Sequence, residues 1–103
     1  MEKVKVILDV DTATGIPCRD VDDGLAIALA LASPEIDLIG ITTCAGNCRT
    51  HESTENSLRI LQLAGREDIP VAEGRELPFL QDVTANFDFL DSWTRDYEFL
   101  WKE

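Results

Sequence analysis

The sequence predicts an α/β protein built on an open, mostly parallel sheet of the doubly wound, Rossmann-like kind. Strand-like and helix-like segments alternate along residues 1–78, and such alternation is typical of parallel strands joined by right-handed helical crossovers. The first two strand-like segments each lead into small or polar residues, where ligands bind in open α/β sheets. We therefore expect one small domain with its functional groups at the carboxyl ends of the strands.

The alternating segments differ in composition in the way that strands and helices do. The strand-like segments are short and rich in Val and Ile, and the helix-like segments are longer and rich in Ala or Leu. Ser33-Pro34 is expected to end the first helix, and Gly65 suits the C-terminal cap of the second. The expected strands are residues 4–9, 36–43 and 69–72, and the expected helices are residues 22–32 and about 50–64.

The tail, residues 79–103, has a different pattern. Large apolar side chains recur at spacings of three and four, which predicts an amphipathic helix: Phe87, Leu90, Trp93, Tyr97, Leu100 and Trp101. The acidic residues between them are expected on its solvated side: Asp82, Asp88, Asp91 and Asp96. We expect residues 1–78 to form a βαβαβ segment and the tail to belong to the same domain. The aromatic face then either folds back on the sheet, forms a subunit interface or is left bare.

The net charge of −11 limits the classes of partner. An acidic surface repels the phosphates of nucleic acids and of anionic lipids and attracts metal cations, so we expect no nucleic-acid or membrane partner. No apolar stretch is long enough to span a bilayer, and the first residues lead into a strand-like segment instead of a signal peptide. We expect a cytoplasmic protein, and the aromatic tail leads us to expect a homo-oligomer.

Five aspartates lie where the first strand-like segment leads into the first helix: Asp9, Asp11, Asp20, Asp22 and Asp23. Carboxylates this close repel one another, and a hard cation such as calcium, which prefers oxygen ligands, would offset the repulsion. Alternatively, the loop is simply solvated and Asp22 or Asp23 caps the helix. Capping leaves Asp9 and Asp11 unexplained, so the pattern favours a cation site.

The cysteines, Cys18, Cys44 and Cys48, are odd in number, and without a secretion signal we expect reduced thiols. A zinc site formed by the three cysteines and His51 is an alternative. Its spacing differs from the Cys-x2-Cys pattern of structural zinc sites, so the sequence favours free thiols.

Four segments together resemble the N-terminal part of the inosine-uridine-preferring nucleoside hydrolases. They cover most of residues 3–78 in the order of that family: residues 6–11 (VILDVD), 22–28 (DDGLAIA), 33–47 (SPEIDLIGITTCAGN) and 56–71 (NSLRILQLAGREDIPV). The resemblance implies a calcium-dependent enzyme that hydrolyses the N-glycosidic bond of ribonucleosides to ribose and free base.

The resemblance also implies roles for individual residues. Asp11 matches the family's calcium ligand and general base, which takes a proton from the attacking water, and Asp23 matches a second calcium ligand. Asp22 and Asn47 match residues that bind the ribose, and Asp9 matches an aspartate that supports the others.

Two features depart from the family pattern. A longer loop, residues 12–21, separates the Asp-x-Asp element from the Asp-Asp pair, so Asp20 is an alternative ligand, and Gly24 stands where a small residue such as Ala is common. Family members are also several times longer, and their other calcium ligands and the histidine that assists the leaving base lie in later segments. A second hypothesis is therefore a catalytically incomplete truncated relative, or a fragment, that acts as a binding or assembly protein.

Two other metal-dependent classes fit the sequence less well. In a haloacid-dehalogenase-like phosphatase Asp9 would be the nucleophile and Asp11 the acid, but Ala13 stands where Thr or Val is expected. An EF-hand would place a helix before the loop and a glycine at Thr14, whereas the sequence predicts a strand and has no such glycine.

Overall fold

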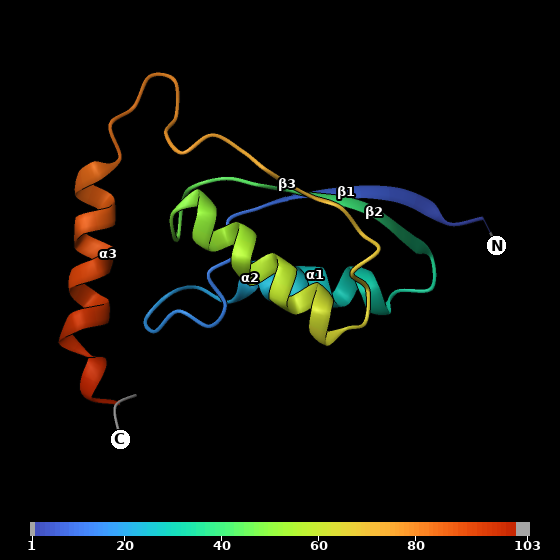
Figure 1. Cartoon of the computed structure of the whole chain (residues 1–103), viewed down its shortest axis with the longest axis horizontal. Coiled ribbons are helices and arrows are strands. Elements are labelled where there is room, and N and C mark those ends of the chain that lie inside the picture. Colours follow the sequence, from blue (N-terminus) through green and yellow to red (C-terminus); the bar gives the residue numbers. More distant parts are fainter. Residues whose placement is uncertain (1, 101–103) are drawn as a thin grey trace.

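The computed structural model describes residues 2–100. Its three strands, β1 (Val4–Val10), β2 (Ile36–Thr43) and β3 (Val71–Glu73), form one parallel sheet in the order β1-β2-β3. Helix α1 (Asp22–Ala32) connects β1 to β2, and α2 (Thr50–Leu63) connects β2 to β3 (Figure 1). The predicted α/β class with parallel strands is confirmed, and the bounds of the first two strands and two helices agree with the expected ones to within a residue.

Both connecting helices lie on the same face of the sheet (Figure 1). Right-handed crossovers between strands in sequential order require this arrangement. The core forms between the sheet and these helices, and its fully buried members include Ile27 of α1, Ile41 of β2 and Leu61 of α2. Ile7 and Ile39 are exposed instead, at 61% and 42%, so among the described residues only one face of the sheet has a core.

Local sequence explains where the helices end. The Ser33 hydroxyl donates to the Leu29 carbonyl at 2.7 Å, and Pro34 follows, so α1 stops there. Gly65 takes a φ of +68°, which only glycine adopts without steric cost, and its N–H and that of Arg66 donate to carbonyls of the last turn of α2. The predicted cap at Gly65 is confirmed.

The buried face of α2 is mostly polar, although the segment that forms this helix contains several leucines. Leu58 and Leu63 are exposed, at 49% and 83%. The buried face carries small polar residues together with one leucine: Thr50, Ser53, Asn56, Ser57 and Leu61. The side chains of Ser53, Asn56 and Ser57 bond the chain that leaves β1, and the Thr50 hydroxyl donates to the Arg75 carbonyl. This face is polar because it packs on main-chain groups as well as on the sheet.

The third strand begins two residues later than predicted. Pro70 has no N–H to give to a ladder, and instead its carbonyl accepts the Ile41 N–H at 3.0 Å. The ladder of β3 with β2 therefore starts at Val71, opposite Ile41.

The tail forms helix α3 (Thr84–Asp96) and a short 3-10 turn, η1 (Glu98–Leu100). Figure 1 shows α3 standing across the carboxyl end of the sheet, apart from α1 and α2. Phe87 is its one buried residue, and Trp93 and Tyr97 are each 46% exposed. The predicted amphipathic helix is present, but it packs at the end of the strands instead of on a face of the sheet. Trp101 lies outside the described residues.

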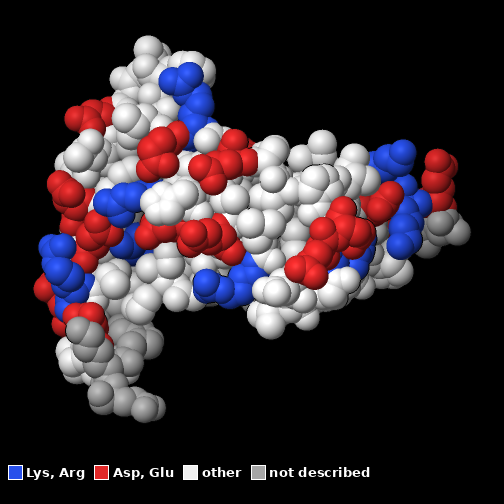
Figure 2. Space-filling model, in the orientation of Figure 1, with Lys and Arg blue, Asp and Glu red and all other residues white. Residues whose placement is uncertain are grey.

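Charge is spread over the surface of the described part of the chain. Figure 2 shows acidic side chains over α3 and over the rest of the visible face, with the few Lys and Arg side chains between them. Within residues 2–100 no helix combines the length and apolar character needed to cross a membrane.

The loop of residues 12–21 packs closely on the first turn of α1. Thr14 lies over Gly24, which is buried, and a Cβ at Gly24 would overlap the Thr14 hydroxyl and lie 2.9 Å from Thr14 Cβ. This contact explains why glycine stands at position 24: Thr14 of the long loop occupies the space that a methyl group would need.

We therefore expect Gly24→Ala to destabilise the chain, although alanine favours a helix more than glycine does by up to about 1 kcal/mol. Overlap with Thr14 should outweigh this gain and lower the free energy of unfolding by about 1–3 kcal/mol. Urea denaturation measures the change, and Thr14→Gly in the Gly24→Ala background should recover most of the loss. A Gly24→Ala variant more stable than the wild type would contradict the packing described.

Candidate functional site

Two of the predicted site carboxylates, Asp11 and Asp23, meet at the carboxyl end of β1. The Asp11 N–H donates to Asp23 Oδ2 at 2.7 Å, although the long loop separates the two residues. This bond ties the first turn of α1 to the residue that follows β1, so the inserted loop does not carry Asp23 away from Asp11. Asp23 therefore contacts the end of β1. The N-cap residue of α1 is Val21, and no side chain caps this helix.

The turn after β2 holds Asp11 from the other side. The Asn47 N–H donates to Asp11 Oδ2 at 2.8 Å, which is the short distance expected for a charge-assisted bond. Gly46 permits this approach, because a Cβ there would overlap the Asp11 carboxylate. The described contacts of Asn47 with the site run through its main chain.

The environment of Asp11 favours its protonated form. Its pKa is raised from 3.8 to about 6, chiefly by burial and also by a hydrogen bond with the Asp23 side chain and repulsion by that carboxylate, while the Asn47 N–H opposes the shift. Ionising Asp11 beside the Asp23 carboxylate is therefore costly, and a cation bound to the pair would offset this cost.

Polar side chains of α2 fix the chain just after β1. Thr12 is fully buried; its N–H donates to Ser53 Oγ at 2.9 Å, and its carbonyl accepts from Asn56 Nδ2 at 3.1 Å. Ser57 Oγ donates to Thr12 Oγ1 at 3.0 Å, and Ser53 Oγ donates to the Val10 carbonyl at 3.2 Å. The sequence analysis did not predict a role for these residues of α2, although Ser53 and Ser57 stand at helical spacing and lie on one face of the helix.

The other aspartates of the cluster lie in more open positions. Asp9 is exposed on the sheet and accepts a hydrogen bond from Thr42 Oγ1 at 2.8 Å, and these two residues are register partners in the β1–β2 ladder. Asp20 and Asp22 are both exposed. Within residues 2–100, no three or more His, Cys, Asp or Glu side chains gather in a way that could hold a metal ion.

This finding also argues against the zinc alternative, since the three cysteines and His51 all lie within the described part of the chain. Cys48 is buried, and burial raises the pKa of its thiol to about 12, with further contributions from Glu52 and Asp11. Its Sγ points at the Thr12 carbonyl, 3.3 Å away. A thiol held protonated is a poor metal ligand, and all three cysteines are free, as predicted.

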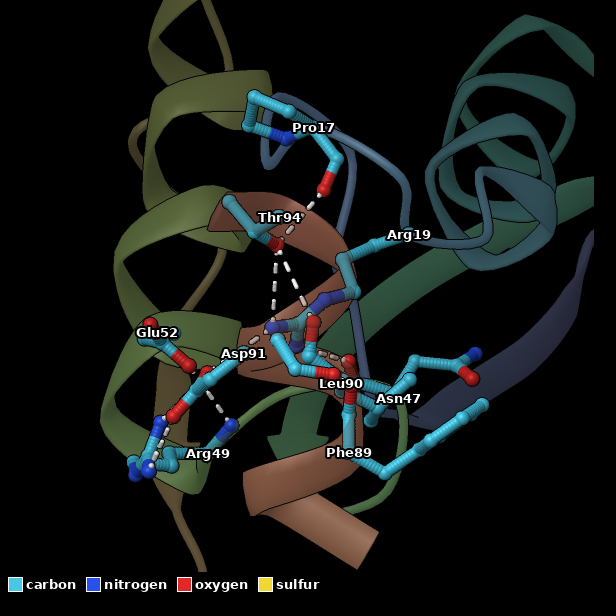
Figure 3. Close-up of polar contacts among 10 residues, drawn as sticks. Pro17, Arg19, Asn47, Arg49, Glu52, Phe89, Leu90, Asp91 and Thr94 are labelled. Atoms are coloured by element: carbon cyan, nitrogen blue, oxygen red, sulfur yellow. Dashed lines mark hydrogen bonds and ion pairs between the residues drawn. The ribbon is translucent and has the colours of Figure 1, made fainter. Parts of the chain in front are cut away.

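An ion-pair network joins α3 to this region. Arg19 is buried, with 3% of its side chain exposed, and its Nη2 lies 3.0 Å from Asp91 Oδ1. Arg49, which immediately precedes α2, contacts the same carboxylate at 2.9 Å. Figure 3 shows Asp91 between the two guanidinium groups. The prediction that Asp91 lies on a solvated face is therefore wrong, because Asp91 is the residue by which α3 docks.

A pocket of about 390 Å³ lies beside the turn after β2. Its walls come from this turn, from the segment that leads into α3 and from the first turn of α3: they include Cys44, Gly46, Phe79, Asn86 and Phe87. Gly46 both lines the pocket and lies against the Asp11 carboxylate, so the pocket adjoins the turn that holds Asp11.

A sequence family described as inosine-uridine preferring nucleoside hydrolase matches residues 6–92, which is most of the chain. The chain belongs to this family. The resemblance predicted from residues 3–78 is thereby confirmed, and the match extends into α3.

Individual nucleoside hydrolases agree with this assignment. The chain is 47% identical over 82 residues to the probable uridine nucleosidase 2 of Arabidopsis thaliana, covering 80% of this chain and 23% of the relative. It is 52% identical over 62 residues to the pyrimidine-specific ribonucleoside hydrolase RihA of Citrobacter koseri, covering 60% and 20%.

Solved structures of nucleoside hydrolases share the fold. A plant nucleoside hydrolase, PpNRh1, superposes with a TM-score of 0.61 at 53% identity and covers 70% of this chain and 20% of that one. A purine-preferring ribonucleoside hydrolase from Gardnerella vaginalis gives a TM-score of 0.66 at 40% identity, covering 77% and 23%. The chain thus spans about a fifth to a quarter of the length of these nucleoside hydrolases.

The raised pKa of Asp11 predicts a pH-dependent effect of Asp11→Asn on the metal-free chain. Because the folded chain holds this proton more tightly than the unfolded chain, the stabilisation is complete below the ordinary pKa of 3.8 and is lost as the pH rises through about 6. Asparagine cannot ionise, so the variant should unfold at a higher temperature than the wild type at about pH 8, with a gain of roughly 1–3 kcal/mol.

At about pH 3, below the ordinary pKa of 3.8, the two proteins should differ little, because Asp11 is then mostly protonated in both the folded and the unfolded wild type. Asp20→Asn, which neutralises an exposed aspartate of the neighbouring loop, is the matched control and should show no such pH dependence. Thermal unfolding followed by circular dichroism measures all three proteins. Destabilisation by Asp11→Asn at about pH 8 would contradict the raised pKa.

Proposed function

We propose that this chain contributes the first part of a calcium-dependent nucleoside hydrolase site, which hydrolyses the N-glycosidic bond of ribonucleosides to ribose and base. The observation that carries the proposal is the Asp11–Asp23 pair at the carboxyl end of β1, in a chain that belongs to the nucleoside hydrolase family. The relatives' names specify uridine, pyrimidine and purine nucleosides, and the proposal here is for ribonucleosides as a class.

The donor set of the pair fits part of a calcium shell. Calcium takes six to eight oxygen ligands, tolerates irregular carboxylate arrangements and is the hard cation that two adjoining carboxylates attract. Asp11 and Asp23 are the residues of this chain that would hold the ion. The raised pKa of Asp11 means that its ionised form is costly in the metal-free chain, and the positive charge of the ion would offset that cost. Among residues 2–100 no third acidic, histidine or cysteine side chain lies close enough to complete a metal site with this pair. The remaining ligands would therefore come from water, from the substrate or from another polypeptide segment.

Asp11 and Asn47 then have separate roles in activating the attacking water. When bound, calcium supplies the positive charge that makes a water easier to deprotonate. Asp11 accepts the proton from the attacking water, and the Asn47 N–H orients the accepting carboxylate.

The other predicted residues hold the substrate and the strand end. Asp22 and Asn47 bind ribose hydroxyls, which places the anomeric carbon beside the water and lowers the entropic cost of attack. Asp9, fixed by Thr42, supports the end of β1.

A second function is favoured by the small share of the relatives' length that the chain covers and by the incomplete ligand set. In that case the chain binds calcium or a nucleoside without turnover, or assembles with other polypeptides, as a catalytically incomplete member of the family.

Release of reducing sugar from a panel of ribonucleosides by the purified chain tests the first function against the second. Hydrolysis that requires calcium and stops with chelator supports the enzyme. Asp23→Asn should then reduce both calcium affinity and rate at least about tenfold, because it removes one of two charged ligands, while Asp20→Asn should leave both within about twofold. Absence of release from a folded sample that still binds calcium would support the binding function.

The pH dependence of calcium affinity is a separate test of the ligand assignment, and isothermal titration calorimetry measures it. Because the ion competes with the proton that Asp11 holds, affinity should rise as the pH increases through about 6 and level off above it. Asp11→Asn should weaken binding and remove this rise. Binding that is independent of pH between about 5 and 8 would show that the ion is held elsewhere.

A further inference from the structure

Arg19 contacts both the candidate site and helix α3. Its Nη1 donates to the Asn47 carbonyl at 2.9 Å, and its Nη2 donates to Asp91 Oδ1 at 3.0 Å and to Thr94 Oγ1 at 3.3 Å. Figure 3 shows the guanidinium lying between Asn47 on one side and Asp91 and Thr94 on the other. Arg19 belongs to the long loop that departs from the family pattern, so the resemblance assigns it no role.

We propose that Arg19 is a positioning residue for the Asp11 carboxylate, and that through Arg19 the docking of α3 is coupled to the geometry of the candidate site. The inference deepens the proposed function and rests on it where it concerns calcium.

Asn47 is held at both of its main-chain groups. Its N–H donates to Asp11 Oδ2 at 2.8 Å, and its carbonyl accepts from Arg19. A turn in which both groups of one residue have charged partners loses freedom at that residue, so the direction of the N–H toward Asp11 depends on where Arg19 lies.

Arg19 is in turn held by a counter-charge on α3. A guanidinium with 3% of its side chain exposed needs a counter-charge, because burying an unpaired charge is costly. Among the described contacts Asp91 supplies it, and Asp91 is on α3. The planar guanidinium presents its donors in fixed directions, so contact with Asp91 on one side determines where Nη1 points on the other.

The loop around Arg19 makes this linkage stiffer. Thr94 Oγ1 donates to the Pro17 carbonyl at 3.0 Å, so α3 touches the loop at two points. Cys18, between them, has a φ of +62°, an uncommon conformation for a residue with a side chain. The loop is thus held against α3 on both sides of Cys18, and a shift of α3 displaces Arg19.

Arg49 provides a matched comparison. It contacts the same Asp91 carboxylate and lies over the Phe87 ring at 5.2 Å, yet its described contacts do not include Asn47. A residue that only anchors α3 should behave like Arg49, whereas a positioning residue should also change the Asn47 N–H.

Amide hydrogen exchange at Asn47, measured by NMR on the metal-free, full-length chain, tests the inference without relying on calcium binding or hydrolysis. We expect Arg19→Met to accelerate exchange of the Asn47 N–H at least about tenfold, the size expected when a charge-assisted bond is weakened. Arg19→Lys should restore part of the protection, and Asp91→Asn, which keeps Arg19 and removes its counter-charge, should also accelerate exchange at Asn47.

Two controls separate positioning from general stability. Arg49→Met should leave Asn47 within about twofold of the wild type, and the Ile41 N–H, which donates to Pro70 within the sheet, should keep its rate in every variant. An unchanged Asn47 rate in Arg19→Met or in Asp91→Asn would overturn the inference. Equal acceleration at Asn47 and Ile41 would overturn it too, since Arg19 would then act on the stability of the whole fold.

Calcium affinity supplies a further readout. If the wild type binds calcium, Arg19→Met should weaken binding by a factor similar to its effect on exchange at Asn47, and Arg49→Met should not. If the wild type does not bind calcium, the proposed function fails for this chain, while the exchange measurements still decide the role of Arg19.

Discussion

Asp11 is held at the end of β1 between the main-chain donor of Asn47 and the like-charged side chain of Asp23. The N–H of Asp11 in turn bonds Asp23, so the group that fixes the second carboxylate is the main chain of the first. Burial and the neighbouring Asp23 side chain make it costly to ionise Asp11 in this arrangement, and they raise its pKa. The surrounding residues hold Asp11 and Asp23 in this arrangement.

Several separate elements meet at this point. Gly46 lets the turn after β2 approach Asp11, the polar stripe of α2 binds the chain at Thr12, and the long loop passes over Gly24 without displacing Asp23. Helix α3 closes the carboxyl end of the sheet, held by Asp91 between two arginines. The site is therefore assembled from the ends of β1 and β2 and the start of α1, as expected for an open α/β sheet, and α3 is the one element that reaches it chiefly through ion pairs.

Much of the fold could be predicted because it depends on local patterns. The alternation of apolar strand-like and helical segments, Ser33-Pro34 and Gly65 act within a few residues of where they stand, and the elements they predict are present. The pairing of Asp11 with Asp23 followed from a family motif. The missed features depend on distant contacts: the buried polar stripe of α2 is determined by Thr12, and the docking of Asp91 by Arg19, 72 residues earlier in the chain. Periodicity cannot distinguish a solvated aspartate from one that meets an arginine of a distant loop.

The central claim is that a cation binds at the Asp11–Asp23 pair and displaces the proton that Asp11 holds. Calorimetric titration of calcium into the chain near pH 6, repeated in buffers of different ionisation enthalpy, counts the protons released on binding. The account predicts release of a substantial fraction of one proton, which falls toward zero near pH 8 and disappears in Asp11→Asn. Calcium binding near pH 6 without proton release would contradict the account, because the ion would then occupy a site other than the Asp11–Asp23 pair.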